Sequence, residues 1–583
     1  MFRKNILTIL AVVLFVTQVC CYGGPIIYVD DDANGINDGT SWDDAYMYLQ
    51  DALADANSAE KPVEIRVAQG IYRPDRSSTE PNGTGGRAAT FQLINGVTVK
   101  GGYAGPRICL LGADPNARDV DLYETILSGD LDDNDIDVND PALLPWEPTR
   151  AENSYHVVTG SRTDETAILD GFIVTAGNAD GPWQQGNNRG GGMYNTSSGS
   201  MVTIVRNCSF TKNSAGLGGG MCNYNASPTL TNCTFNRNSA CDSGGGMYND
   251  HCSPTVTDCI FKGNLAAGWW GYGDGGGMYN YGSGRPTLTN CIFSGNSAAG
   301  QWAGGGGMYN LWCSTTLTNC TFSGNSAVFG AAVYIDESGL RITNCIFWDG
   351  GNEIGKYDTW TKITYSNVQS GEPGEGNIDA DPCFADAANG DYHLKSQAGR
   401  WDPENKSWVQ DAVTSPCIDA GDTMSPISYE PFPNGGIINM GAYGGTPEAS
   451  KSSLGAPVCE TIVAGDINGD CKVDFKDFAV IAQHWLFDNM PTPPGQASNP
   501  LPPDGATGVD VGTVLFWTAG VGAESHDVYF GTTDPPPFWQ NRISTLFKPP
   551  TPLNRNTTYY WRIDEVNVWG KATGEVWTFR TSN

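Results

Sequence analysis

The chain has 583 residues, of which 74 are glycine, and its 64 acidic and 33 basic side chains give a formal net charge of -31. The glycine content favours a turn-rich β protein with few helices. Because an acidic surface repels polyanions, the charge argues against nucleic acid as a partner; it is compatible with divalent cations or with simple solubility.

Residues 1–22 have the pattern of a secretory signal peptide. The basic run FRK precedes an apolar run over residues 6–16, and small residues follow. We therefore expect an exported protein, secreted or held at the cell surface. The run TQVC at 17–20 lacks the small residue that a lipobox needs before its cysteine, which argues against a lipid anchor. No later stretch is apolar over about 18 residues, so no transmembrane helix is expected.

A helix is predicted over residues 41–56, because Trp42, Ala45, Leu49 and Ala52 fall on one helical face. It would cap the first coil of the fold described next. The runs EIRVAQGIY, GVTVKGGY, ETILSGD and LDGFIVTAGNA predict strands of irregular coils. After the third of these runs, a loop gathers five aspartates and is either a calcium site or a solvated insertion: Asp130, Asp132, Asp133, Asp135 and Asp137.

An Asn-Cys-x-Phe repeat dominates the middle of the chain. Its five regular copies and its one Asp-Cys variant begin at Asn207, Asn232, Asp258, Asn290, Asn319 and Asn344. In the copy LTNCTF, Leu230, Cys233 and Phe235 are three and then two residues apart, whereas a plain strand alternates by two throughout. Asparagine tolerates the left-handed conformation, so a bend at Asn232 would restore the inward direction of the next strand.

A strand, a short bend and a second strand, repeated about every 25 residues, predict the coils of a parallel β-helix. Equivalent residues then stack about 4.8 Å apart. We expect interior ladders of cysteine and phenylalanine, with asparagines along one edge bonded to each other's backbones. For the cysteines, a structural role is favoured over metal binding or redox chemistry, since a buried cysteine acts as a small hydrophobic residue.

Each unit continues as Phe-x-x-Asn-Ser-Ala and then Gly-Gly-Gly-Met-Tyr-Asn, with the glycines opening the next strand. This repeat resembles those of chlamydial polymorphic outer membrane proteins and, more broadly, the pectin-lyase-like right-handed β-helix family. The resemblance implies a right-handed parallel β-helix over 23–450. The runs GNIDADPCFADAANGDYHL, SPCIDAGD and NMGAYGG are interpreted as its last coils, similar to the terminal region of surface β-helix proteins of planctomycete-type bacteria. Cys383 and Cys417 could form a disulfide there.

The segment 458–490 contains a calcium-loop pattern. Oxygen ligands at loop positions one, three, five, seven, nine and twelve fall on Asp466, Asn468, Asp470, the Lys472 carbonyl, Asp474 and Asp477. An amphipathic helix is expected after the loop. The segment resembles a type I dockerin repeat, which implies calcium as a cofactor and a cohesin-like scaffold as partner. Position six is Cys471 instead of glycine, and only one such loop is found, both departures from a full dockerin.

A proline-rich linker at 491–504 leads to a C-terminal β-sandwich at 505–583. Leu553, Thr557 and Tyr559 follow the tyrosine-corner pattern, and Trp517 is the expected buried tryptophan. The stretch resembles a fibronectin type III domain, which implies a spacer or adhesive unit.

Nothing in the sequence identifies a catalytic centre. The acid and histidine motifs of polygalacturonases and the WIDH run of pectate lyases are missing, and His156, His251, His393, His484 and His526 are interpreted as structural. Loop aromatics at Trp269, Trp270, Tyr272, Trp302 and Trp312, with Trp183, would either stack on sugar rings or pack on the sheet. The sequence favours glycan binding or adhesion to a neighbouring surface, with a divergent polysaccharide lyase or hydrolase and a scaffold-docked component as alternatives.

Overall fold

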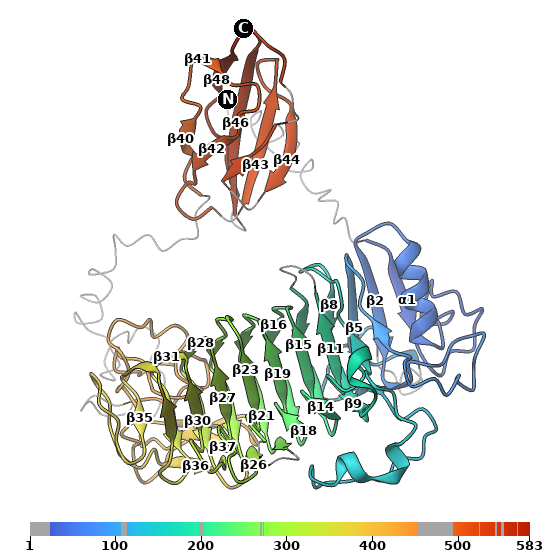
Figure 1. Cartoon of the computed structure of the whole chain (residues 1–583), viewed down its shortest axis with the longest axis vertical. Helices are drawn as coiled ribbons and strands as arrows, with labels where there is room; N and C mark the ends of the chain where they lie inside the picture. Colours follow the sequence, from blue (N-terminus) through green and yellow to red (C-terminus); the bar gives the residue numbers. More distant parts are fainter. Residues whose placement is uncertain are drawn as a thin grey trace, which may run out of the picture. The chain divides into compact units, whose positions relative to one another are not determined.

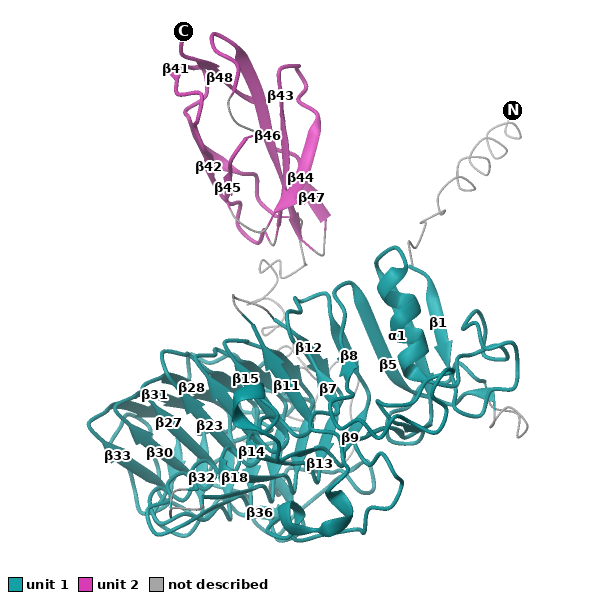
Figure 2. Ribbon diagram, turned by 45° about the vertical axis from the view of Figure 1, so that its right-hand side comes forward, with its two compact units in different colours: residues 1–463, 469–472 teal, residues 464–468, 473–583 magenta. Residues whose placement is uncertain are grey.

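The structure is a computed structural model. It describes residues 24–106, 114–197, 202–268, 271, 273–452, 494–523, 525–542, 545–549, 553–567 and 570–583. The chain divides into two compact units, residues 1–463 with 469–472 and residues 464–468 with 473–583 (Figure 2).

Unit 1 is a parallel β-helix, in which strands far apart in sequence lie side by side (Figure 1). Sheet A contains β1 (Ile26–Val29), β2 (Val63–Ala68), β5 (Val97–Tyr103), β8 (Ile168–Asp170), β12 (Ile204–Arg206), β16 (Thr229–Thr231), β20 (Thr255–Thr257), β24 (Thr287–Thr289), β28 (Ser314–Thr318), β31 (Gly339–Thr343) and β34 (Trp360–Thr364). Sheet B contains β3 (Gly70–Tyr72), β6 (Thr125–Ser128), β9 (Ile173–Thr175), β13 (Ser209–Thr211), β17 (Thr234–Asn236), β21 (Ile260–Lys262), β25 (Ile292–Ser294), β29 (Thr321–Ser323), β32 (Ile346–Trp348) and β35 (Asn367–Val368).

Two further sheets complete the coils. Sheet C contains β4 (Phe91–Gln92), β7 (Val158–Thr159), β11 (Met193–Thr196), β15 (Met221–Tyr224), β19 (Met247–Asp250), β23 (Met278–Tyr281), β27 (Met308–Leu311), β30 (Val333–Asp336) and β33 (Ile354–Tyr357). Sheet D contains β10 (Asn178–Ala179), β14 (Ser214–Leu217), β18 (Ser239–Ser243), β22 (Leu265–Ala267) and β26 (Ser297–Ala299). A full coil therefore visits sheets A, B, D and C in turn.

The predicted asparagine bend joins sheet A to sheet B in every central coil. The bend residue has a left-handed backbone, with φ between 51° and 58°, at Asn207, Asn232, Asp258, Asn290, Asn319 and Asn344. We call these six residues the bend file. The prediction of their backbone is confirmed. Their amides bond to other side chains or to the backbones of residues 422, 439 and 444, not to each other's backbones as expected, as in Asn232 Nδ2 to Asn207 Oδ1 at 2.9 Å.

The interior ladders are confirmed. Phenylalanine rings stack from coil to coil with centroids 4.6 to 4.9 Å apart, from Phe210 through Phe235, Phe261, Phe293 and Phe322 to Phe347. The six repeat cysteines are buried beside them, and burial raises the pKa of the Cys259 thiol well above its usual range. Glycines open the sheet C strands because backbones approach there: a Cβ on Gly277 would lie 2.5 Å from the Gly307 carbonyl oxygen.

A second ladder consists of fully buried asparagines from the Phe-x-x-Asn part of the repeat. Asn264 shows the pattern: its Nδ2 donates to Phe235 O and to Asn296 Oδ1, both at 2.9 Å. Its Oδ1 accepts from the backbone N and from Nδ2 of Asn238, at 3.0 and 2.9 Å. Each amide therefore satisfies the backbone at the corner between sheets B and D.

The N-terminal helix is shorter than predicted. Helix α1 spans Leu49–Ser58 and packs against β1, β2 and β4. Trp42 and Ala45 are buried as expected but precede the helix. The reason is that Tyr46 pairs with the backbone of β1, donating to Tyr28 O and accepting from Asp30 N at 2.9 Å each. Three short 3-10 helices lie at Leu144–Trp146, Pro148–Arg150 and Trp183–Gln185.

The segment after β35 continues the parallel stack only at Ile378, which pairs with Asn367, and otherwise does not form the last coils that the sequence predicted. It makes two antiparallel hairpins, β36 (Phe384–Asp386) with β37 (Asp391–Leu394) and β38 (Arg400–Asp402) with β39 (Ser407–Val409). It then runs back along the helix, since Gly441 N donates to Asn344 O and Ala442 N to Thr321 Oγ1. Cys383 and Cys417 are both free thiols.

The described part of unit 2 has two facing sheets. One contains β40 (Ser498–Leu501), β42 (Leu515–Thr518) and β45 (Leu546–Phe547); the other contains β41 (Ala506–Val509), β43 (Ser525–Gly531), β44 (Phe538–Arg542), β46 (Thr558–Asn567), β47 (Gly570–Ala572) and β48 (Trp577–Thr581). Trp517 is buried, as predicted. The Tyr559 hydroxyl accepts from Asn554 N at 2.9 Å, which is the expected tyrosine corner.

Candidate functional site

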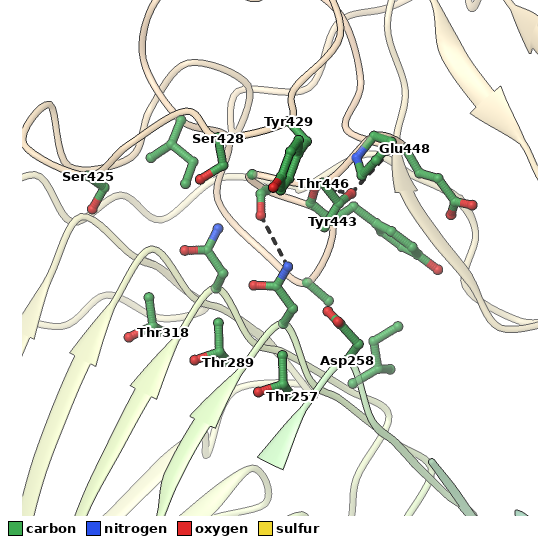
Figure 3. A pocket seen from close by; sticks show the side chains of 18 of the residues that line it. Thr257, Asp258, Thr289, Thr318, Ser425, Ser428, Tyr429, Tyr443, Thr446 and Glu448 are labelled. Carbon is green, nitrogen blue, oxygen red and sulfur yellow. Dashed lines mark hydrogen bonds between the residues drawn. The ribbon is translucent and has the colours of Figure 1, made fainter. Parts of the chain in front are cut away.

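A groove of about 770 Å³ lies between the bend file and the returning segment 425–448. We call it the axial groove, because it crosses successive coils. Its polar floor comes from Asn232, Thr257, Asp258, Thr289, Asn290, Thr318 and Asn319, and its other wall includes Pro426, Tyr429, Ile438, Tyr443, Pro447 and Glu448. Figure 3 shows the three threonines standing in a row, one per strand, opposite the loop that carries the two tyrosines.

The coil repeat itself builds the floor. Thr257, Thr289 and Thr318 are register partners at the ends of β20, β24 and β28. The left-handed residue that follows each of them presents an amide or a carboxylate. With coils about 4.8 Å apart, the four coils from Asn232 to Asn319 give a polar row roughly 15 Å long.

The returning segment is fastened to the coils by direct hydrogen bonds. Asn290 Nδ2 donates to Gly444 O at 3.4 Å, and Asn319 Nδ2 donates to Asn439 O at 3.3 Å (Figure 3 draws the first). Tyr429 remains 77% exposed at the rim. The wall is therefore held in place while one aromatic face stays available to a ligand.

A buried histidine supports the same wall. His393 is 1% exposed, and its ring stacks on Tyr443 with centroids 3.6 Å apart. Its Nδ1 lies 2.6 Å from Asp391 Oδ1, and its Nε2 lies 3.3 Å from Glu448 Oε2. Burial lowers the pKa of His393, but the bonds to the two acids outweigh burial and raise it overall. The imidazole ring thus contacts both Tyr443 and Glu448 at the groove.

Glu430 organises the loop behind Tyr429. Its side chain is buried, and Oε1 accepts from Asn439 N at 2.8 Å and from Gly445 N at 2.9 Å. Burial raises the pKa of Glu430 from 4.5 to about 7, although the two backbone donors oppose this.

Replacing Glu430 by glutamine should remove a pH dependence of stability. Because the folded-state pKa lies above the unfolded value, protonated Glu430 favours folding below about pH 4.5, and this stabilisation is lost as the pH rises through about 7. The free energy of unfolding of the wild type, relative to E430Q, should fall by about 2 kcal/mol between about pH 5 and about pH 8. Urea denaturation of both proteins measures the difference, and parallel pH profiles would contradict the assignment.

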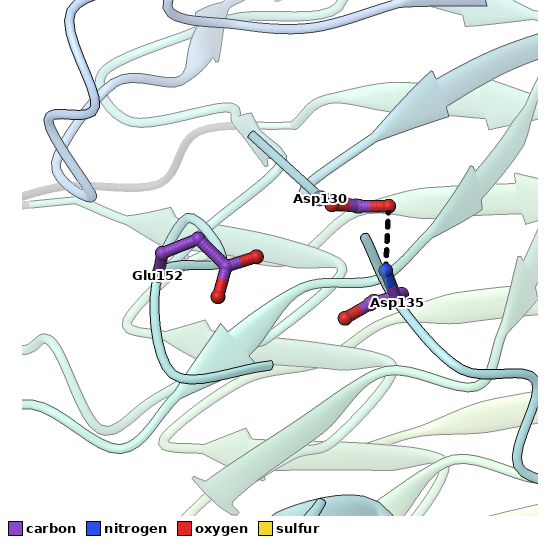
Figure 4. Close-up of side chains that lie close together, drawn as sticks. All are labelled: Asp130, Asp135 and Glu152. Carbon is purple, nitrogen blue, oxygen red and sulfur yellow. Dashed lines mark hydrogen bonds between the residues drawn. The ribbon is translucent and has the colours of Figure 1, made fainter. Parts of the chain in front are cut away.

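Most of the acidic loop over residues 131–140 is exposed, although ion pairs tie it to the coils. Asp133 pairs with Arg73, and Asp137 pairs with Lys212. Asp130 and Asp135 meet Glu152, with one carboxylate oxygen from each within 4.8 Å of the others (Figure 4). Burial raises the pKa of Asp135 to about 6 despite the nearby charge of Arg150. The three carboxylates have the oxygen chemistry that a hard cation requires.

Among the aromatic side chains predicted to stack on sugar, the three that the structure describes do not form one row. Trp302 lies between sheets D and C, whereas Trp312 follows β27 on the way to sheet A; they are 52% and 49% exposed. Trp183 lies in another loop between sheets D and C. None of these three lines the axial groove. Trp269, Trp270 and Tyr272 lie outside the described residues, as do Asp466, Asn468, Asp470, Lys472, Asp474 and Asp477 of the calcium loop.

The sequence pointed to the bend file but not to the other wall of the groove. Tyr443 was assigned to a last coil, and Tyr429 was not singled out. The interpretation of His393 as structural agrees with its buried position behind the wall. Asp258 stood out as the single acid at an asparagine position of the repeat.

Comparison with known families bears on the solenoid and on the segment after it. The model for the right handed beta helix region matches residues 180–314 and 269–372. These residues carry the stacked parallel strands described above. Unit 1 is a right-handed parallel β-helix. A second model, described as disaggregatase related, matches residues 360–421, from β34 through both hairpins of this β-helix unit. No curated protein matches the chain. Within the described residues, no helix is long and apolar enough to cross a membrane.

Proposed function

We propose that the axial groove binds an extended polysaccharide chain. The observation that carries this proposal is that side chains able to bind sugar recur at the spacing of the coils. Hydroxyl and amide groups recur once per coil along the floor, and tyrosine and proline side chains line the wall. Hydroxyl and amide side chains both donate and accept hydrogen bonds, and aromatic faces pack on apolar sugar faces. The groove volume of about 770 Å³ is within the range of ordinary ligand sites.

Titration calorimetry of the full chain against neutral oligosaccharides of about six sugars tests the proposal. Tyr429→Ala should weaken binding about tenfold, since the ring is exposed and its loss removes a stacking face without opening the core. Tyr357→Ala is the matched control, because Tyr357 is 61% exposed on β33, outside the groove. Equal losses in both variants, or binding by neither variant nor wild type, would reject the groove as the site.

Hydrolysis of the bound chain is the second candidate, supported by the two carboxylates that line the groove, Asp258 and Glu448. Glycoside hydrolases use such a pair as proton donor and as base or nucleophile. The experiment is release of reducing ends from neutral polysaccharides, followed with Asp258→Asn and Glu448→Gln. Product formation that survives both substitutions would exclude this pair.

The chain is proposed to act outside the cell, secreted or attached to a surface, as its first 22 residues indicate. The disaggregatase-related match is compatible with a role at surfaces that adhere to one another. Docking to a cohesin-like scaffold through residues 458–490 is a further proposal. It requires a partner whose capture by the full chain is lost when calcium is chelated.

The calcium loop remains a prediction with its own test. In the full chain, Asp466→Asn with Asp477→Asn should weaken calcium binding at this site by tenfold or more, because two of its four carboxylates are neutralised. Asp135→Asn serves as comparison, since it changes the other acidic cluster. A calcium isotherm that changes with Asp135→Asn but not with the double substitution would place the ion outside the predicted loop.

A further inference from the structure

The axial groove has an unusual balance of charge. Among the residues that the structure describes, its lining contains the carboxylates of Asp258 and Glu448 and no lysine, arginine or histidine side chain. The chain as a whole adds a net charge of -31. A polyuronate carries one carboxylate per sugar, so binding it would bring like charges together with no cation from the protein between them.

Asp258 differs from the rest of the bend file in what it offers a ligand. The file members that line the groove use their amide as a donor: Asn232 to Asn207 Oδ1, Asn290 to Gly444 O and Asn319 to Asn439 O. A carboxylate cannot donate. Its two oxygens accept only, which suits a pair of sugar hydroxyls and opposes a second carboxylate.

The acid at position 258 is not needed to build the coil. Its φ of 54° lies within the range of the five asparagines of the file. Among the described residues, no ion pair joins its carboxylate to a basic side chain, and burial alone raises its pKa. A ligand that donates hydrogen bonds would therefore stabilise this charge, and an anionic ligand would destabilise it.

We propose that the axial groove selects uncharged polysaccharide chains and rejects polyuronates, and that Asp258 sets this preference. The inference rests on the proposed function and names its substrate class. It departs from the acidic polysaccharides that β-helix lyases and hydrolases cleave, because the positive groups that would neutralise uronates do not line this groove.

The test compares two probes of equal length, a neutral hexasaccharide chosen from cello-, manno- and xylo-hexaose and a hexagalacturonate, by titration calorimetry at low salt. Wild type should bind the best neutral probe at least about tenfold more tightly than the uronate. Asp258→Asn should reduce that ratio by about tenfold, and this variant should fold because five coils already carry asparagine there. Raising the salt concentration should also reduce the wild-type ratio, because salt screens the repulsion between the groove and the uronate.

Asp379→Asn is the control for net charge, since Asp379 is exposed and does not line the groove. The control should leave the ratio unchanged. Equal binding of both probes by wild type, an unchanged ratio in Asp258→Asn, or tighter binding of a glucosamine hexamer than of every neutral probe would overturn the inference while the groove remained a glycan site. Binding of no probe by wild type would instead overturn the proposed function itself.

Discussion

Replacing Phe261 by alanine should lower the free energy of unfolding of the β-helix by about 3 to 5 kcal/mol. The ring is fully buried and stacks on Phe235 at 4.8 Å and on Phe293 at 4.6 Å. The cavity would lie between two rings fixed by their own coils, so the site cannot collapse without shifting a register pair. Urea denaturation followed by circular dichroism measures the loss.

The matched control for this prediction is Phe538→Ala, which removes a ring that is 55% exposed in unit 2. It should change the stability of the β-helix by less than about 0.5 kcal/mol. A small effect of Phe261→Ala, similar to that of the control, would mean that the stacked phenylalanine rings do not stabilise the folded β-helix.

Replacing Asn264 by alanine should cost about 3 kcal/mol or more, although few apolar atoms are lost. The substitution leaves the backbone N and the Nδ2 of Asn238 without their shared acceptor and the Phe235 carbonyl without its donor. Each buried polar group left unpaired costs about 1 to 3 kcal/mol. Asn236→Ala should cost less than about 0.5 kcal/mol, since Asn236 makes only a 3.4 Å bond to Thr211 at the surface.

These two results separate the contributions of apolar stacking and of the amide ladder. If Asn264→Ala proved as mild as Asn236→Ala, water would be satisfying the corner between sheets B and D, and the asparagine ladder would not be needed for the coil. If both ladders stabilise the β-helix, the losses in free energy of unfolding caused by substitutions in distant coils should be additive, because each coil contacts mainly its neighbours.

The solenoid could be predicted well from the sequence because the spacing that defines each coil is short and recurs in every repeat. The three-then-two spacing of Leu230, Cys233 and Phe235 anticipated the left-handed bend that the structure has at Asn232, with φ of 52°. Stacked phenylalanines follow directly from that register. Even the calcium-or-insertion alternative for the acidic loop placed Asp130 and Asp135 together, although Glu152 comes from a later stretch.

The groove could not be predicted because its wall has no repeat. Tyr429 and Tyr443 lie in a segment whose position depends on contacts with coils about a hundred residues earlier, such as Gly441 with Asn344. Beyond Ile378, the interpretation of this segment as coils was wrong for the same reason: short apolar runs do not distinguish a parallel strand from a hairpin or a turn. Trp302 and Trp312 do not share a row because they flank one strand, β27, from opposite corners.

The bend that shapes each coil also presents a polar group to the groove. In the proposed function, the same left-handed residues serve both the solenoid and the ligand. An acid can replace an asparagine at position 258 without disturbing the stack, so single substitutions there should change the proposed specificity of the groove.

A crystal structure of the full chain with a neutral hexasaccharide would show directly whether sugar occupies the axial groove. We expect sugar rings lying across the row of Thr257, Thr289 and Thr318, with hydroxyls bonded to Asp258 and a ring face against Tyr429. Sugar bound instead at Trp302, at Trp312 or on unit 2, with the axial groove filled only by water, would contradict this expectation.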